Sequence, residues 1–356
     1  MTGTSLDGLD AALVRLDGRG LEMRATLVRA ASRPLEDLVA PLRAFAEQAP
    51  MSAGEVANLS RRFSMLHAEA LADLWRTARP EGAAPRPDLV AVHGQTVFHA
   101  PPVSWQLLTP ALIARALECP VVSDLRAADL AAGGQGAPIT PLADWVLFRD
   151  AIEARGVANL GGFCNITLMG PAPAGTDSIR GFDLCACNHV LDAVARRVLG
   201  VPYDEGGRAA QSAEPDHDAL DDLLGIFTAQ RGAKRSLGTG DDDVMSWIGR
   251  HRARLSGAAL AATACEAIGQ MIAREAPCDR LILAGGGTRN AALAGAIASC
   301  CSCRVSASGD LGLPAEYREA VSIAVLGALC QDRVPITLPR VTGVPRAPVA
   351  GSWVLP

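Results

Sequence analysis

The sequence contains no long hydrophobic run and no block of basic residues. The stretch that comes closest to a membrane span, residues 255–272, carries Glu266 and is rich in alanine and glycine, so we interpret it as a buried helix. The 33 lysines and arginines are scattered, and the formal net charge of -5 argues against a nucleic acid as the main partner. No basic segment followed by an apolar core opens the chain, so we expect a cytoplasmic protein without a membrane partner.

The cysteines also lack the spacing of a metal centre. The chain has ten of them, and they cluster only at Cys185-Ala186-Cys187 and Cys300-Cys301-Ser302-Cys303. Neither cluster has the two-residue spacer of a zinc site. We therefore favour buried thiols in a reducing compartment over a structural metal site.

What the sequence does contain is typical of a globular protein with two domains. Hydrophobic residues make up 49% and charged residues 20% of the 356 positions, which is not the composition of a disordered chain. A chain of this length is expected to form two domains of ordinary size, each with its own core.

The most informative segment lies at the start of the chain and reads Gly3-Thr4-Ser5-Leu6-Asp7-Gly8-Leu9-Asp10. Its glycines permit a tight turn before an expected strand, and the hydroxyl and N–H groups of Thr4 and Ser5 can hold phosphate oxygens. Asp7 and Asp10 can bind Mg²⁺ directly or through water. Taken alone, the segment fits an ordinary polar hairpin turn equally well.

Two later glycine-rich turns favour the phosphate interpretation. Gly161-Gly162 begins a second glycine–hydroxyl hairpin that includes Asn165 and Thr167, and Gly285-Gly286-Gly287 ends an apolar strand and precedes a helix. Two such hairpins in separate halves of the chain predict two α/β domains that close on a nucleotide. This arrangement is typical of the actin-like sugar kinases.

Hydrophobic periodicity predicts the order of the main elements. We expect strands over residues 9–16, 21–29, 88–92 and 120–123, and helices from residue 56 onward, over 142–150 and over 188–199, the last one capped by Asn188. Open α/β sheets bind ligands where their strands end. The residues after the third and fourth strands are therefore candidates for ligand binding.

Arg180-Gly181-Phe182-Asp183 is where we place the acid–base centre. Asp183 follows the second phosphate hairpin and precedes the helix expected from residue 188. A carboxylate there can take a proton from water or from a substrate hydroxyl, as phosphoryl transfer requires. An aspartate that caps a turn is the alternative.

Further candidates for substrate binding are Gln95 and Thr96 at a strand end, since both donate and accept hydrogen bonds. His93 fits a ligand contact or a buried core histidine. For Arg126, Asp129 and Glu319, a solvated or ion-paired role is the more common one for isolated charged residues.

These motifs, in this order, resemble the anhydro-N-acetylmuramic acid kinase family over nearly the whole chain. The opening turn is similar to the family's Met-Ser-Gly-Thr-Ser-Leu-Asp-Gly loop, with Thr2 in place of the serine. The other matching blocks are His93 to His99, Asp124-Leu125-Arg126, Gly133 to Pro138, Asn159 to Gly162, Gly285 to Gly287, Glu319-Ala320 and Leu338 to Gly343.

The resemblance implies an α/β fold of two actin-like, ribonuclease-H-like domains, with a cleft for nucleotide and substrate between them. We expect the first domain to comprise residues 1–125 and 336–356, and the second to comprise residues 126–335. Family members use ATP and Mg²⁺ to open 1,6-anhydro-N-acetylmuramic acid with water and to phosphorylate the freed 6-oxygen. The resemblance makes Asp183 the base that activates this water, and implies a homodimer that acts in cell-wall recycling.

The chain departs from the family pattern beside Asp183. The family's Gly-Phe-Asp-Thr-Gly-Pro-Gly-Asn is here Gly181 to Asn188, with Leu184, Cys185 and Cys187 in place of a threonine and two glycines. A cysteine at a backbone position with positive φ would cost on the order of 1 kcal/mol. The family's Lys-Ser-Leu-Gly-Arg-Glu also loses its last two charges, at Thr239 and Gly240.

These departures leave two alternatives to the active kinase. One is a paralogue that binds nucleotide but has lost catalysis and serves as a sensor or regulatory partner. The other is a kinase for a different amino- or anhydro-sugar.

A further expectation concerns the first strand, because family members carry a strand before the opening turn. Only Met1 and Thr2 precede Gly3, so we expect the natural chain to begin about ten residues earlier.

Overall fold

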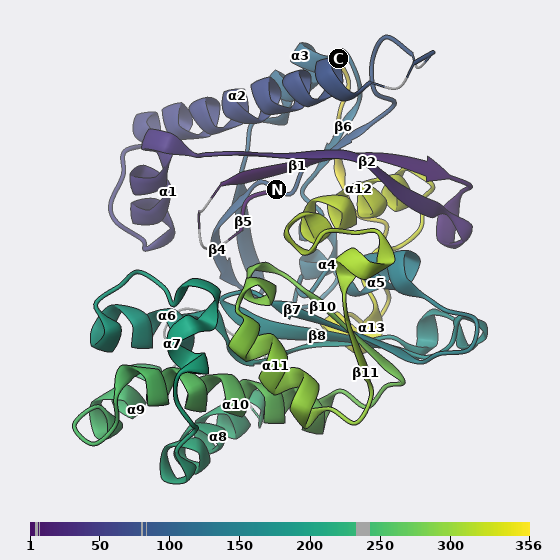
Figure 1. The fold of residues 1–356 in the computed structure, drawn as a ribbon. Helices are drawn as coiled ribbons and strands as arrows, with labels where there is room; N and C mark the ends of the chain where they lie inside the picture. Colours follow the sequence, from purple (N-terminus) through teal and green to yellow (C-terminus); the bar gives the residue numbers. More distant parts are fainter. Residues whose placement is uncertain (4–5, 7, 80, 83, 233–242) are drawn as a thin grey trace. The chain divides into compact units, whose positions relative to one another are not determined.

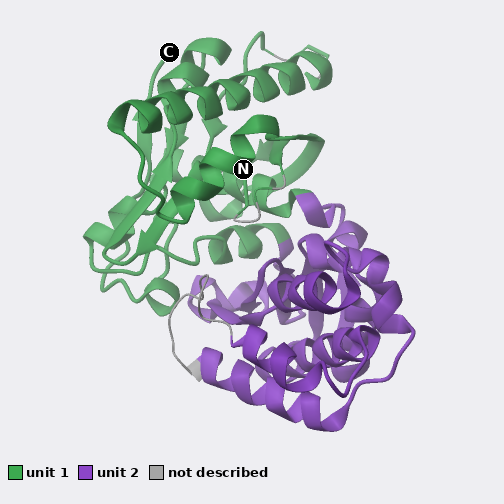
Figure 2. Ribbon diagram, turned by 90° about the vertical axis from the view of Figure 1, so that its left-hand side faces the viewer, with its two compact units in different colours: residues 1–147, 317–356 green, residues 148–316 purple. Residues whose placement is uncertain are grey.

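The computed structural model describes residues 1–3, 6, 8–79, 81–82, 84–232 and 243–356. The chain forms two compact units, which are shown in different colours in Figure 2. Unit 1 contains Met1–Leu147 and Tyr317–Pro356, and unit 2 contains Phe148–Glu316. Three residues of the predicted opening turn, Thr4, Ser5 and Asp7, lie outside the described residues, and so does the departure at Thr239 and Gly240. Within the described ranges, no helix is long and apolar enough to cross a membrane.

Unit 2 is built on a mixed five-stranded sheet with the strand order β11-β10-β7-β8-β9. Its strands are β7 (Arg155–Leu160), β8 (Phe163–Met169), β9 (Arg180–Ala186), β10 (Arg280–Ala284) and β11 (Arg304–Ala307). β7, β8 and β9 pair antiparallel in succession, whereas β10 runs parallel to both β7 and β11. This order is the ribonuclease-H-like arrangement of an actin-like domain, so the predicted fold class is confirmed for this unit.

Helices cover the sheet of unit 2 and complete its core. They are α6 (Asn188–Val194, continued by a π-helical turn over Ala195–Leu199), α7 (Arg208–Gln211), α8 (His217–Gly232), α9 (Val244–His251), α10 (Gly257–Glu275) and α11 (Ala291–Cys300). α10 buries most of its side chains, which explains the alanine-rich apolar stretch in the sequence. Trp247 is fully buried, and its indole N–H donates to the carbonyl oxygen of Ala219 at 2.8 Å, so its polar atom is satisfied.

Unit 1 contains three smaller groups of strands, labelled in Figure 1. β1 (Leu9–Asp17) and β2 (Arg24–Arg33) form an antiparallel hairpin, β4 (Gln95–Ala100) and β5 (Val103–Leu107) form another, and β12 (Ser352–Val354), β6 (Val121–Ser123) and β3 (Val90–Ala91) form a sheet in that order. The helices are α1 (Val39–Ala46), α2 (Ala53–Ala78), α3 (Pro110–Leu117), α4 (Ala127–Ala131), α5 (Pro141–Phe148), α12 (Arg318–Gln331) and α13 (Pro339–Thr342).

Most predicted elements of unit 1 are confirmed. The hairpin turn at Asp17 to Gly20 joins β1 and β2 as expected, although β2 begins three residues later than the predicted strand because a 3₁₀ turn over Gly20–Glu22 intervenes. The long helix α2 begins at a capping box, in which Ser52 and Glu55 satisfy each other's backbone N–H groups. The predicted apolar face of α2 is buried at Leu59, Phe63 and Leu74.

One local prediction is wrong. The helix from residue 188 exists, but Asn188 does not cap it, because the N-cap position is Cys187. The amide of Asn188 instead donates to the carbonyl oxygen of Leu160 at 3.2 Å. The side chain of Asn188 therefore links the helix to β7 and does not cap it.

The domain bounds expected from the sequence stay a prediction, and the two compact units divide the chain at other positions. Unit 1 extends to Leu147 and resumes at Tyr317, instead of ending at residue 125 and resuming at 336. A fully buried ion pair joins Asp144 of α5 to Arg318 of α12 within unit 1. It ties both helices into unit 1 close to the two points where the chain crosses between the units.

We expect the substitution Arg318→Met to lower the free energy of unfolding by about 3–5 kcal/mol, because it leaves the Asp144 carboxylate buried without its counter-charge. Urea unfolding at pH 7 measures this loss. The matched control is Arg15→Met, since the pair of Arg15 with Asp17 is largely exposed and should contribute less than about 1 kcal/mol. Equal losses for the two variants would contradict the assigned role of the buried pair.

Candidate functional site

The second phosphate hairpin of the sequence is the turn between β7 and β8. The carbonyl oxygen of Gly162 accepts from the N–H groups of Cys187 at 2.8 Å and His189 at 3.1 Å, and that of Gly161 accepts from the N–H of Asn188 at 3.0 Å. The hairpin is thereby fixed against the first turn of α6. Because these N–H groups already have partners, the start of α6 supports the hairpin and is not itself an open anion site.

The late glycine turn packs backbone against backbone on the end of β7. At Gly285, which has a φ of +85°, an added Cβ would lie 2.7 Å from Asn159 Oδ1 and 2.9 Å from the carbonyl oxygen of Leu160. A Cβ at Gly287 would lie 2.7 Å from the Leu160 Cβ. Gly286 is exposed and has open space around it. Its backbone can therefore be approached closely by a ligand, while its two neighbours hold the turn in place.

Asp183 lies on β9, the edge strand next to this hairpin. It is half-buried, and it pairs in register with Asn165 of β8. Thr167, two residues further along β8, pairs with Gly181 and is buried. The structure thus brings the predicted base together with the predicted hairpin residues on adjacent strands of one sheet.

The end of α8 supports this edge strand, and no local sequence pattern predicts this support. Gln230 Oε1 accepts from the N–H of Ala186 at 3.2 Å. The guanidinium of Arg231 lies 4.0 Å from the ring centroid of Phe182, and its Nε donates to Glu275 at 3.2 Å. β9 is therefore held at both ends of the segment that contains Asp183.

The departures beside Asp183 lie in the core of unit 2. Leu184, Cys185 and Cys187 are fully buried. Neither cysteine is among the described residues with positive φ, and Cys187 has a φ of -123°, so the backbone strain considered from the sequence does not arise. Burial raises the pKa of both thiols well above the ordinary value, so they are neutral apolar core groups.

In unit 1, four motifs that are far apart in the sequence form one hydrogen-bonded network. Arg126 Nε donates to His93 Nε2 at 3.0 Å, and Arg126 Nη1 donates to the carbonyl oxygen of Gly136 at 2.7 Å. The N–H of Gly136 donates to Asp129 at 2.7 Å, and the hydroxyl of Thr342 donates to the same carboxylate at 2.8 Å. The network joins the ends of β3 and β6, the loop 133–138 and α13.

Within this network, Asp129 is fully buried and bonded to its own loop and to Thr342. At Gly134, an added Cβ would overlap its carboxylate. Asp129 therefore shapes the loop that holds Arg126. His93 is also buried, and its Nδ1 lies 3.0 Å from the carbonyl oxygen of Gly94. Since Nε2 accepts from Arg126, Nδ1 carries the proton and the imidazole is neutral. Burial, and then the charge of Arg126, lower the pKa of His93 to about 3.

The β4–β5 hairpin adds a row of polar side chains. Gln106 Nε2 lies 3.5 Å from Thr96 Oγ1 and donates to Ser104 Oγ at 2.8 Å, and His99 Nδ1 lies 2.9 Å from Ser104 Oγ. Burial and Arg126 lower the pKa of His99, which places this row near Arg126. Among the described residues, Gln95 Oε1 and His99 Nε2 are buried atoms without a hydrogen-bond partner. Such atoms are suited to a bound polar ligand.

The described part of the opening turn is anchored by its leucines. Leu6 and Leu9 are buried in the core of unit 1, and Leu6 has a φ of +59°, a strained conformation for a side chain of this size. A Cβ at Gly8 would lie 3.2 Å from the carbonyl oxygen of Arg33. Asp10 accepts from Ser32 Oγ. Burial lowers the pKa of the Met1 amino group to about 6, and the charges of Asp10 and Glu319 partly oppose this shift. The two carboxylates therefore lie near that amino group.

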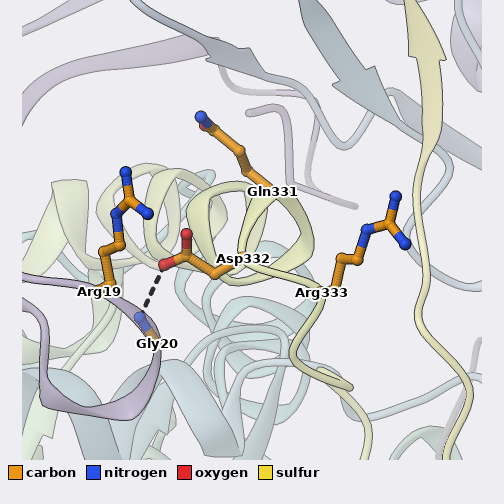
Figure 3. Close-up of a pocket in the computed structure, with 5 residues that line it drawn as sticks. All are labelled: Arg19, Gly20, Gln331, Asp332 and Arg333. Carbon is orange, nitrogen blue, oxygen red and sulfur yellow. Dashed lines mark hydrogen bonds between the residues drawn. The ribbon is translucent and has the colours of Figure 1, made fainter.

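A surface pocket of about 470 Å³ lies elsewhere in unit 1, between the β1–β2 turn and the end of α12 (Figure 3). It is lined by Arg19, Gly20, Gln331, Asp332 and Arg333, and Asp332 accepts from the N–H of Gly20 at 2.7 Å. None of the predicted site residues lines it, so we do not assign the function to this pocket.

Comparisons with known proteins agree with the motifs. The family described as anhydro-N-acetylmuramic acid kinase matches residues 1–355. Proteins of that name from Salinibacter ruber and Bordetella pertussis are each 36% identical, over 100% and 99% of this chain and 95% and 94% of theirs. The one from Prochlorococcus marinus is 34% identical over 99% of this chain and 97% of its own.

Similar solved structures are more distant. The (R)-2-hydroxyglutaryl-CoA dehydratase component A from Acidaminococcus fermentans has a TM-score of 0.42 and 10% identity, and covers 89% of this chain and 98% of its own. A ROK family glucokinase from Streptomyces griseus, in complex with glucose and AMPPNP, has a TM-score of 0.35 and 13% identity, with 89% and 99% covered.

We expect Gly285→Ala to destabilise the protein by about 1–3 kcal/mol, because the new Cβ combines a left-handed backbone with a collision against β7. Gly286→Ala is the matched control, since its Cβ would enter open space, and it should stay within about 0.5 kcal/mol of the parent protein. Urea unfolding measures both. A neutral Gly285→Ala would show that the turn does not pack on β7 as described.

The pKa of His93 predicts a dependence of stability on pH. The unfolded histidine has a pKa of about 6.5, and the folded one has a pKa of about 3. Between these values unfolding takes up a proton, so the free energy of unfolding should fall as the pH falls, by up to about 1.4 kcal/mol per pH unit. Urea titrations at pH 7 and pH 5 should show a shallower fall for His93→Gln. The exposed His217→Gln serves as control, and an unchanged slope for His93→Gln would contradict the assignment.

Proposed function

The chain belongs to the anhydro-N-acetylmuramic acid kinase family, and we propose that it opens 1,6-anhydro-N-acetylmuramic acid with water and phosphorylates it with ATP. In this reaction water adds to the anomeric carbon and the bond from that carbon to the bridging oxygen breaks. The freed 6-oxygen attacks the γ-phosphorus of ATP, and ADP leaves. The product is N-acetylmuramic acid 6-phosphate, as expected for an enzyme of cell-wall recycling.

The observation that carries this proposal is the position of Asp183. Its carboxylate is half-buried on an edge strand, and this strand pairs with the strand that starts at the Gly161-Gly162 hairpin. A base next to a phosphate-binding turn can take the proton of the attacking water while the transferred phosphoryl group is held close by. The supports from Gln230 and Arg231 favour a fixed carboxylate, which general-base catalysis needs.

For ATP we propose contacts from both glycine-rich regions of unit 2 and from the opening turn of unit 1. In unit 2 they are Gly161, Gly162, Asn165, Thr167 and Gly285 to Gly287. In unit 1 they are Gly3, Thr4, Ser5, Leu6, Asp7, Gly8, Leu9 and Asp10, of which Leu6 and Leu9 would act through their backbone because their side chains are buried. The turn at Gly286 supports this role, because a nucleotide can approach a backbone without a Cβ.

For Mg²⁺ we propose Asp10, together with Asp7. Mg²⁺ is commonly held by one or two carboxylates plus phosphate oxygens and water, so this pair suffices. When bound, Mg²⁺ would neutralise charge on the phosphates during transfer.

For the sugar we propose Gln95, Thr96, Arg126 and Glu319 as direct contacts. The partnerless Gln95 Oε1 supports this assignment, because a sugar hydroxyl or amide could donate to it. We propose that His93 and Asp129 act by positioning Arg126, since both are buried in its network. A cytoplasmic homodimer, implied by the family resemblance, completes the proposal.

The test is sugar-dependent formation of ADP by the full chain with Mg²⁺ and 1,6-anhydro-N-acetylmuramic acid. We expect Asp183→Asn to lower kcat by at least about a hundredfold, since a general base contributes about 10²–10⁴ in rate. ATP affinity, measured by titration calorimetry, should change little. The control is Asp218→Asn, at a highly exposed site in the same unit, which should keep full activity.

Three results would contradict the proposal. An Asp183→Asn variant with the parent kcat would show that another group acts as the base. ATP binding by the parent protein without turnover of any sugar would identify a paralogue that has lost catalysis. Turnover of other amino- or anhydro-sugars, but not of this one, would identify a kinase of different specificity.

A further inference from the structure

Unit 2 contains a pair of closely spaced thiols that the proposed reaction does not use. The sulfur atoms of Cys278 and Cys303 are 3.8 Å apart. Both side chains are partly buried and lie at the edge of the core, where they retain some access to solvent. Cys301 is a third thiol in this region, and burial and then the neighbouring Cys303 raise the pKa of the Cys301 thiol to about 12.

The backbone around the pair is held in place by neighbouring strands. Cys278 precedes β10 and Cys303 precedes β11, and these strands run parallel with Arg280 opposite Arg304. The N–H of Arg304 donates to the carbonyl oxygen of Asp279 at 3.1 Å. The residues that directly follow the two cysteines are therefore bonded to each other, and the pairing of the thiols is a consequence of the strand register.

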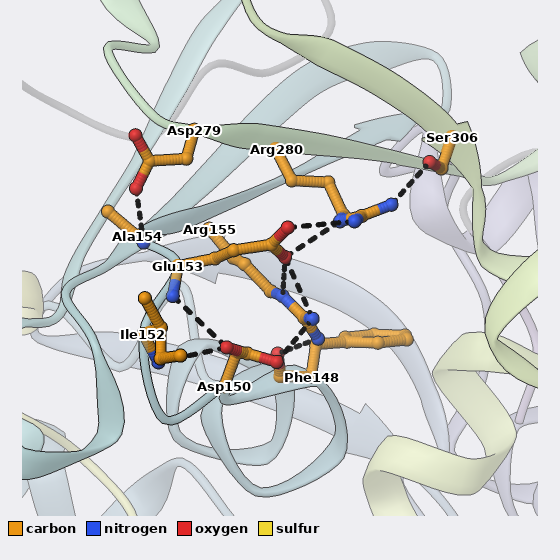
Figure 4. A network of polar contacts seen from close by, with 9 residues as sticks. All are labelled: Phe148, Asp150, Ile152, Glu153, Ala154, Arg155, Asp279, Arg280 and Ser306. Carbon is orange, nitrogen blue, oxygen red and sulfur yellow. Dashed lines mark hydrogen bonds and ion pairs between the residues drawn. The ribbon is translucent and has the colours of Figure 1, made fainter.

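A network of ion pairs fixes the same end of the sheet (Figure 4). Arg280 forms two hydrogen bonds to Glu153, each 2.8 Å long, and a third to Ser306 of β11 at 3.2 Å. The Asp279 carboxylate accepts from the N–H of Ala154 at 2.8 Å. β7, β10 and β11 are thus tied together directly beside the thiols, so the sulfur atoms can meet with little movement of the backbone.

We propose that Cys278 and Cys303 form a reversible disulfide. The oxidant is a small-molecule disulfide, which exchanges with the two thiols. One thiolate attacks a sulfur of the reagent, the reagent's S–S bond breaks, and one small thiol leaves. The second thiolate then attacks the protein sulfur of this mixed disulfide, the Cys278–Cys303 bond forms, and a second small thiol leaves. Two protein thiols are oxidised, the reagent is reduced, and the two protons leave on the small thiols.

The bond would close a covalent loop around the glycine turn proposed for ATP. The loop from Cys278 to Cys303 contains β10, Gly285 to Gly287 and α11. A cross-link of this kind stabilises a fold mainly by restricting the unfolded chain. The five residues of β10 separate the bond from the turn by about 17 Å at 3.3 Å per residue, so oxidation should stabilise unit 2 without blocking the proposed site.

Burial and then the charge of Cys303 raise the pKa of the Cys278 thiol to about 12, so we expect Cys278 itself to be a poor nucleophile at neutral pH. Only a thiolate attacks a disulfide, so the rate of oxidation should rise steadily between pH 7 and pH 9.

The test is incubation of the folded full chain with oxidised glutathione at pH 8.5, followed by mass spectrometry. We expect the intact mass to fall by about 2 Da, the mass of two hydrogens lost in forming a disulfide, with a cross-linked peptide pair that joins Cys278 to Cys303. Cys278→Ser and Cys303→Ser should each prevent this cross-link, whereas the matched control Cys301→Ser should retain it. The melting temperature should rise by several degrees in the oxidised protein and return after treatment with dithiothreitol.

The proposal fails if the reagent yields only single glutathione adducts, or if the cross-link joins Cys301 to Cys303. It also fails if the bond forms but lowers the melting temperature, since the folded geometry would then oppose it. These outcomes do not depend on the kinase reaction, which is measured separately on the reduced protein.

Discussion

The packing of backbone against backbone at the carboxyl end of β7 is the constraint on which the site in unit 2 depends. Gly285 and Gly287 leave no room for a Cβ against Asn159 and Leu160. This close contact brings a turn from late in the chain onto the same strand end as the Gly161-Gly162 hairpin, which is itself held by α6. Because β7 and β10 pair in parallel, the glycine turn after β10 and the Gly161-Gly162 hairpin after β7 both lie at the carboxyl end of these two strands. Any side chain at Gly285 or Gly287 would separate the turn from β7.

The two units show different ways of building a site. In unit 2, backbone groups at strand ends form most of the candidate site, and Asp183 is the carboxylate that we propose as its base. In unit 1, side chains form a chain of hydrogen bonds from His93 through Arg126 and Gly136 to Asp129. A neutral His93 is essential here, because only an unprotonated Nε2 can accept from Arg126. The low pKa of His93 keeps this bond intact well below neutral pH.

Local patterns predicted most of the elements, because glycine turns, strand ends and apolar faces follow from short-range rules, whereas the roles of the candidate residues stay predictions. Long-range packing explains what they missed. Asn188 has the sequence context of a helix cap, but its amide bonds Leu160, a partner 28 residues away. Asp144 pairs with Arg318, a residue 174 positions away, and short-range patterns cannot indicate such a contact. The sequence alone suggests backbone strain at Cys185 and Cys187. The structure shows that neither residue has the positive φ that would cause such strain.

We propose that this chain couples the opening of an anhydro-sugar by water to phosphoryl transfer from ATP. The most direct measurement is a single turnover in water labelled with oxygen-18, followed by mass spectrometry of the sugar and the phosphate. We expect the label at the anomeric carbon of the phosphorylated sugar and none on phosphorus. Label in inorganic phosphate, with the anhydro-sugar unchanged, would contradict it, because the protein would then only hydrolyse ATP.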